Sequence, residues 1–175
     1  MNKKILLFAV AVMAAVAGVW FGQSFIYPRT EPAAQTDFNL PDMQGKSHSL
    51  AAWPDRLIIL NFWATWCPPC REEIPAFIEL QNRHGADGVQ VVGIAIDTLE
   101  QVERYYQTTG MNYPVLMGGE DAMRIMTDFG NNSGSLPYSV IIGRQGQIIA
   151  RKLGAMTLDE LEGILRPHLT GNTSD

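Results

Sequence analysis

Two nearly continuous apolar runs, at residues 57–62 and 89–96, constrain the fold more than any other feature of the sequence. Runs this short and this apolar are typical of β-strands that are covered on both faces. A helical pattern follows each run, since apolar residues recur at three- and four-residue spacing after positions 69 and 98. Strands that alternate with helices predict an α/β domain, in which a central sheet with parallel strands carries helices on both faces.

Shorter patterns complete the expected order of elements. The turn sequences DMQG and GRQG each lie between two strand-like segments and predict two hairpins. Thr98 with Gln101, and Thr157 with Glu160, have the spacing of helix capping boxes. The remaining expected elements are the first hairpin at 38–50, a strand at 113–117, a helix at 122–129, the second hairpin at 139–152 and a final helix from 158.

The first 27 residues are expected to hold the chain at a membrane. Two lysines precede residues 5–22, an uncharged stretch of 18 residues. Such a stretch can cross a ~30 Å hydrocarbon core as a helix, and the lysines favour an exported remainder. The alternative is a cleaved signal peptide, because the AVA sequence at 15–17 resembles a cleavage site. We predict a single-pass anchor in the inner (cytoplasmic) membrane at 1–27, a tether at 28–36 and a periplasmic or other extracytoplasmic domain at 37–175.

The two cysteines are expected to act as one pair. Two cysteines cannot staple a small secreted fold or complete a four-thiolate zinc site. The net charge of −5 argues against a nucleic-acid partner. Cys67 and Cys70 lie where the first buried strand passes into its helix, and one helical turn brings them within disulfide distance.

The position of this pair predicts a role for each thiol. Cys67 is expected at the helix N-terminus, where free backbone N–H groups and the helix dipole favour a thiolate. Cys67 would therefore attack a partner disulfide, and Cys70 would resolve the mixed disulfide. An inert stapling disulfide is disfavoured because so short a loop restrains the unfolded chain little. A metal site is disfavoured because the three histidines have no helpful spacing to the cysteines.

The segment NFWATWCPPCREEIP at residues 61–75 resembles the active site of thioredoxin-fold proteins, and most of all their membrane-anchored TlpA/ResA branch. The resemblance extends from Phe38 to the last helix. It implies a thioredoxin-like fold with an N-terminal β-hairpin and a central βα insertion at 113–129. It also implies extracytoplasmic dithiol–disulfide exchange without a cofactor, commonly the reduction of client disulfides such as those of apocytochrome c. The electrons would come from a transmembrane donor of the DsbD or CcdA kind.

The resemblance also assigns residues around the cysteines. Thioredoxin has a buried aspartate where this chain has Asn61, and the TlpA/ResA branch shares Glu73 instead. Glu73 would exchange a proton with Cys70, although it could merely complement the charge of the helix terminus. Leu136 and Pro137 would be joined by a cis peptide bond facing the dithiol. These two residues, with Trp66 and Pro68, would bind an extended client segment. The glycine- and glutamate-rich motif of the haem-maturation subgroup is missing ahead of Pro137, which argues against a dedicated cytochrome c role.

Two other functions compete with a disulfide reductase. A thiol peroxidase of the related peroxiredoxin type needs a threonine or serine three residues before its cysteine, and this position is Ala64. A copper-delivery or other binding module would use the two cysteines as soft ligands, but no methionine or histidine has a supporting spacing.

Overall fold

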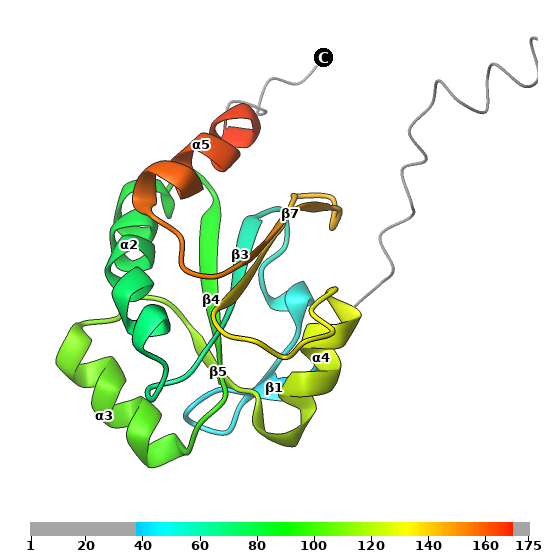
Figure 1. Cartoon of the computed structure of the whole chain (residues 1–175). Helices are drawn as coiled ribbons and strands as arrows, with labels where there is room; N and C mark the ends of the chain where they lie inside the picture. Colours follow the sequence, from blue (N-terminus) through cyan, green and yellow to red (C-terminus); the bar gives the residue numbers. More distant parts are fainter. Residues whose placement is uncertain (1–37, 170–175) are drawn as a thin grey trace, which may run out of the picture. The chain divides into compact units, whose positions relative to one another are not determined.

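The computed structural model describes residues 38–169 (Figure 1). The predicted anchor at 1–27 and the tether at 28–36 lie outside these residues, so both stay predictions. Between residues 38 and 169, no helix combines the length and the apolar character that crossing a membrane requires.

A five-stranded sheet forms the centre of the described domain. Its order is β5-β4-β3-β6-β7. Strands β3 and β4 are parallel, as are β4 and β5, whereas β6 is antiparallel to β3 and to β7. This arrangement confirms the predicted thioredoxin-like α/β fold. The strand bounds are Leu57–Trp63 for β3, Val89–Ala95 for β4, Val115–Met117 for β5, Tyr138–Ile142 for β6 and Ile148–Leu153 for β7.

Helices cover both faces of the sheet, as the alternation of strands and helices predicts. Figure 1 shows α2, α3 and α5 on one side, and α4 on the other. The central strand β3 contributes side chains to the hydrophobic core on both faces. Ile59 and Trp63 belong to one buried cluster, and Leu60 and Phe62 belong to the other. The helix bounds are Pro68–His84 for α2, Leu99–Thr109 for α3, Ala122–Asp128 for α4 and Leu158–Leu169 for α5, with short 3-10 turns at Leu50–Ala52 and Gly119–Asp121.

The N-terminal hairpin, β1 (Leu40–Pro41) with β2 (Ser47–His48), is organised by one carboxylate. Asp42 accepts hydrogen bonds from the backbone N–H groups of Gln44 and Lys46, at 2.9 Å each. It also pairs with the His48 ring at 2.8 Å. A backbone bridge from Asp42 to Leu116 joins the hairpin to β5. The predicted hairpin and the central insertion are therefore neighbours in the fold.

The two predicted capping boxes have different outcomes. At the start of α5, the Glu160 side chain accepts from the Thr157 N–H at 2.9 Å, and the Glu160 N–H donates to the Thr157 hydroxyl at 3.3 Å. The box at α3 is wrong, because Thr98 makes no side-chain cap bond. The adjacent Asp97 carboxylate takes the Thr98 N–H at 2.8 Å, and this is the donor that Gln101 would have bonded.

Candidate active site

Cys67 lies at the N-terminus of α2, immediately after the turn that follows β3. It is the N-cap residue of the helix, and its Sγ accepts a hydrogen bond from the Cys70 N–H at 3.3 Å. Pro68 and Pro69 occupy the first two helical positions and have no N–H to donate. The Cys70 N–H is therefore the backbone donor of this turn that bonds the Cys67 sulfur.

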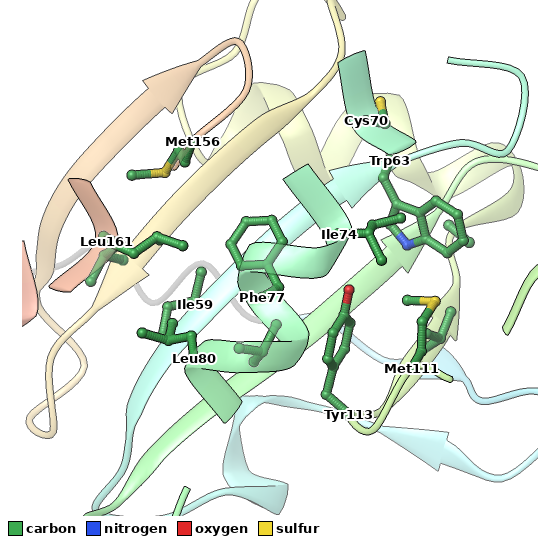
Figure 2. Packing of buried hydrophobic residues seen from close by; sticks show 14 of the residues in the cluster. Ile59, Trp63, Cys70, Ile74, Phe77, Leu80, Met111, Tyr113, Met156 and Leu161 are labelled. Carbon is green, nitrogen blue, oxygen red and sulfur yellow. The ribbon is translucent and has the colours of Figure 1, made fainter. Parts of the chain in front are cut away.

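A disulfide joins Cys67 to Cys70, whose Cα atoms are 5.3 Å apart. This pairing confirms the predicted proximity of the two cysteines. Cys70 is fully buried and belongs to the cluster that includes Trp63 and Met156 (Figure 2). Cys67 is 4% exposed, and the neighbouring Trp66 is 64% exposed. The disulfide thus has an outward side next to Trp66 and an inward side facing the core.

Glu73 lies on the inward side, one turn of α2 beyond Cys70, and is only 1% exposed. Its Oε1 accepts from Asn61 Nδ2 at 2.7 Å, and its Oε2 accepts from the Met156 N–H at 3.0 Å. Burial is the largest influence on the carboxyl and raises the pKa of Glu73 from 4.5 to about 7, although both hydrogen bonds oppose that rise. A carboxyl with this pKa can accept or release a proton near neutral pH.

Asn61 connects Glu73 to the neighbouring strand. It lies in β3 opposite Ser139 of β6, and its Nδ2 also donates to the Ser139 hydroxyl at 3.0 Å. Its Oδ1 has no hydrogen-bond partner among the described residues. The sequence identifies Asn61 only as the replacement for an aspartate, and it does not identify Ser139 or Met156. Ser139 could have been placed beside Asn61 only with knowledge of the antiparallel register of β6 on β3.

Asp97 holds the turn that carries Trp66 to the site. It follows β4, and its Oδ2 accepts from the Thr65 N–H at 3.1 Å and from the Thr65 hydroxyl. Sequence reasoning missed this contact. The position of Asp97 directly after the parallel strand β4 could have indicated this contact, since the carboxyl ends of neighbouring parallel strands meet at one edge of a sheet.

Leu136 and Pro137 are joined by a cis peptide bond, as the resemblance implies. Tyr138 pairs with Phe62 in the antiparallel register, so the chain entering β6 runs beside the chain that leaves β3 toward Cys67. Pro137 is buried, and its carbonyl accepts from the Gly154 N–H at 2.9 Å. Leu136 is partly buried against the cluster that includes Cys67 and Cys70. The structure thus brings the predicted client-binding residues to the end of the sheet where the disulfide lies.

No metal site accompanies the disulfide within residues 38–169, where no three histidine, cysteine or acidic side chains are grouped closely enough to hold an ion.

The sheet order, the disulfide at a helix N-terminus and the cis proline together define a thioredoxin-like protein. The chain belongs to the AhpC/TSA family, whose family model matches residues 32–151.

The relatives carry the names of thiol–disulfide and thioredoxin-like proteins. The chain is 29% identical over 173 residues to "Thiol-disulfide oxidoreductase ResA" of Bacillus thuringiensis (strain Al Hakam). This alignment covers 95% of this chain and 98% of that protein. It is 35% identical over 130 residues to "Thioredoxin-like protein YneN" of Bacillus subtilis (strain 168), covering 72% and 73%. A crystal structure of a thiol:disulfide interchange protein of the thioredoxin family, from Chlorobium tepidum TLS, matches with a TM-score of 0.69 and 31% identity. That match covers 76% of this chain and 93% of the other. These likenesses agree with the resemblance drawn from residues 61–75.

Proposed function

We propose that this thiol–disulfide oxidoreductase reduces disulfide bonds of exported client proteins through Cys67 and Cys70. The observation that carries the proposal is the position of Cys67 as N-cap of α2, paired in a disulfide with a fully buried Cys70. A thiolate at this position is stabilised by the helix dipole, and it can attack a disulfide that approaches from the Trp66 side.

The reaction transfers two electrons in two exchange steps. In the dithiol form, the Cys67 thiolate attacks one sulfur of the client disulfide, a mixed disulfide forms, and the other client sulfur leaves as a thiolate that takes a proton. Cys70 then loses its proton and attacks Cys67 Sγ. This step re-forms the Cys67–Cys70 disulfide and releases the second client thiol. The client is reduced and the protein is oxidised.

Glu73 is the proposed proton acceptor for Cys70. Three features support this role: it is buried, it lies one helical turn from Cys70, and its pKa is about 7. A carboxylate is a stronger base when it is removed from water, so burial suits it to take the thiol proton. Its bond to the Met156 N–H also ties α2 to the segment before α5, so Glu73 combines a structural role with the chemical one.

The client would bind across Trp66, Pro68, Leu136 and Pro137. Trp66 and Pro68 are exposed beside Cys67, and Leu136 is partly exposed at the same end of the sheet. An extended client segment could pair with the backbone of Leu136 while its cystine reaches Cys67. The uncharged stretch at 5–22 supports a membrane anchor with the domain outside the cytoplasm. A reductase there needs electrons from the cytoplasm, so a transmembrane donor of the DsbD or CcdA kind would re-reduce Cys67–Cys70.

A thiol peroxidase is the second candidate and has less support. The position three residues before Cys67 is Ala64, which has no hydroxyl and is fully buried. A peroxide at Cys67 would therefore lack the hydrogen-bond donor that this position supplies in the peroxiredoxin type.

Single cysteine variants test the proposal. Cys67→Ser is expected to abolish the reduction of insulin by the dithiol form, whereas Cys70→Ser should accumulate mixed disulfides through Cys67 because the resolving thiol is absent. Mass spectrometry of the trapped adducts identifies the attached cysteine. Adducts on Cys70 in the Cys67→Ser variant, with none on Cys67 in the other, would reverse the two roles. Insulin left unreduced by the wild-type dithiol, with hydrogen peroxide consumed instead, would favour the peroxidase.

A further inference from the structure

The loop at residues 131–135, between α4 and the cis proline, is organised around the side chain of Asn131. Asn131 Oδ1 accepts from the Ser133 N–H at 3.2 Å, from the Ser133 hydroxyl at 2.8 Å and from the Gly134 N–H at 3.1 Å. Its Nδ2 donates to the Ser135 carbonyl at 2.9 Å. One amide thus bonds three successive residues of a five-residue loop.

Asn131 is itself fixed to the core. It is 5% exposed, its N–H donates to the Met126 carbonyl at 2.8 Å, and its Nδ2 lies 3.7 Å from Met126 Sδ. Two of the residues that it bonds are exposed, in contrast to the buried Asn131: these are Ser133 and Ser135. The bonds that Asn131 makes to these residues are only partly buried and lie outside the sheet, so the fold of the sheet does not require this arrangement. What the amide determines is the path of the loop.

That path leads directly to the proposed client-binding residues. The bond from Asn131 Nδ2 ends on the carbonyl of Ser135, the residue before Leu136. On the other side, the Pro137 carbonyl is held by the Gly154 N–H. The backbone of Leu136 is therefore fixed from both directions, by a side chain before it and by the sheet after it.

We propose that Asn131 is a positioning residue for client binding, which holds the backbone of Leu136 in the conformation that an extended client segment pairs with. This inference rests on the proposed function, because it assumes that clients bind at Leu136. A loop held in place before binding does not lose conformational entropy on binding, so Asn131 acts on affinity. The exchange chemistry at Cys67 does not use Asn131. A small aromatic disulfide without a peptide backbone has no strand to pair with Leu136 and does not depend on the loop.

The test compares a protein disulfide with a small one. Asn131→Ala is expected to raise KM for insulin roughly tenfold, which corresponds to about 1.4 kcal/mol, while kcat changes less than about twofold. The rate with 5,5′-dithiobis(2-nitrobenzoate) should stay within about twofold of the wild type. This small disulfide does not pair with the backbone of Leu136, so the order of the loop does not affect its binding. Asn132→Ala is the matched control, because its side chain is exposed and makes none of these bonds. This control should leave both substrates unaffected.

A conservative variant separates positioning from general loss of structure. Asn131→Asp has nearly the same size and keeps the oxygen that bonds Ser133 and Gly134, but it replaces the donor to the Ser135 carbonyl by an oxygen, so it should raise KM for insulin about as much as Asn131→Ala does. Ser133→Ala removes the hydroxyl bond to Asn131 Oδ1 and also the hydroxyl that accepts the Ser135 N–H at 3.3 Å, so it should raise KM for insulin in the same direction and keeps the test available if Asn131→Ala does not fold.

Equal losses on both substrates in Asn131→Ala, or an unchanged KM for insulin, would overturn the inference. A wild-type protein that reduces neither substrate would instead contradict the proposed function itself.

Discussion

The two sides of the Cys67–Cys70 disulfide differ in almost every physical respect. We refer to Trp66, Pro68 and Leu136 as the rim, and to Cys70, Glu73, Asn61 and Ser139 as the floor. Trp66 in the rim is 64% exposed, whereas all four floor residues are 1% exposed or less. The floor holds a hydrogen-bonded carboxyl whose pKa is raised to about 7, and no rim residue carries an ionisable group.

This difference separates two tasks that one disulfide exchange requires. The attack by Cys67 needs access for a large client, which an exposed tryptophan and a partly exposed loop provide. The second step needs a base for Cys70, and burial is what raises a carboxyl pKa into the range where it is useful. The comparison predicts that floor variants change pH dependence, and that rim variants change client affinity.

The largest expected effect is on the floor. Glu73→Gln removes the base while keeping the size of the side chain, and it should slow insulin reduction roughly 100-fold at pH 8, the low end of general acid–base contributions. The wild-type rate should rise through about pH 7 as Glu73 ionises, and the variant should lose this limb. Glu72→Gln is the matched control, since Glu72 is exposed on the same turn of α2. Identical pH–rate profiles for the wild type and Glu73→Gln would leave Glu73 with a structural role alone.

The same carboxyl should affect stability with a definite sign. The folded protein binds the Glu73 proton more tightly than the unfolded chain does, because the pKa rises from 4.5 to about 7 on folding. The free energy of unfolding therefore falls as the pH increases from 4.5 to 7, by about 3 kcal/mol at ~1.4 kcal/mol per pKa unit. Urea unfolding of the oxidised protein at both pH values measures this slope. Glu73→Gln should lack it, and an equally steep slope in the variant would assign the effect to another group.

The next effect concerns the hydrogen bond within the floor. Asn61→Leu removes the donor to the ionised Glu73, so the Glu73 pKa should rise further and the pH–rate midpoint should move up by roughly one unit. Ser139→Ala removes the other partner of Asn61 without changing the Asn61–Glu73 bond, and it should move the midpoint less. A midpoint that moves down in Asn61→Leu would mean that Asn61 does not stabilise the carboxylate.

The smallest effect on activity belongs to the rim, and the buried Trp63 provides a contrast in stability to the exposed Trp66. Trp66→Ala should raise KM for insulin by about 3- to 10-fold, a typical loss for an interface tryptophan, with little change in stability because the side chain is exposed. Trp63→Ala should instead lower the free energy of unfolding by about 3–5 kcal/mol, because Trp63 is fully buried. Its ring packs against that of Tyr105, with the two ring centroids 5.5 Å apart. If Trp66→Ala left KM unchanged, the rim would not be the client-binding surface.

The rim and the floor also differ in how far the sequence could predict them. Trp66, Cys67 and Pro68 are contiguous, and their placement follows from a strand that passes into a helix. The partners of Glu73 come from distant segments, Asn61 in β3 and Met156 before α5, and only the folded topology brings them together. Asp97 joins Thr65 across the ends of two strands and also takes the Thr98 N–H, and this second bond is the reason that the capping box expected at α3 does not form.

The reduction potential of the Cys67–Cys70 pair tests the central claim, that this domain is a reductase, most directly. A dithiol is strongly oxidising when its first thiolate is highly stabilised. Cys67 has the helix N-terminus and the Cys70 N–H, but Pro68 and Pro69 offer no donors, no histidine lies between the cysteines, and Glu73 places a carboxylate nearby. We therefore predict a potential closer to ~−270 mV, as in thioredoxin, than to ~−120 mV, as in DsbA. Equilibration with glutathione measures it, and a value above about −180 mV, that of protein disulfide isomerase, would contradict the reductase assignment.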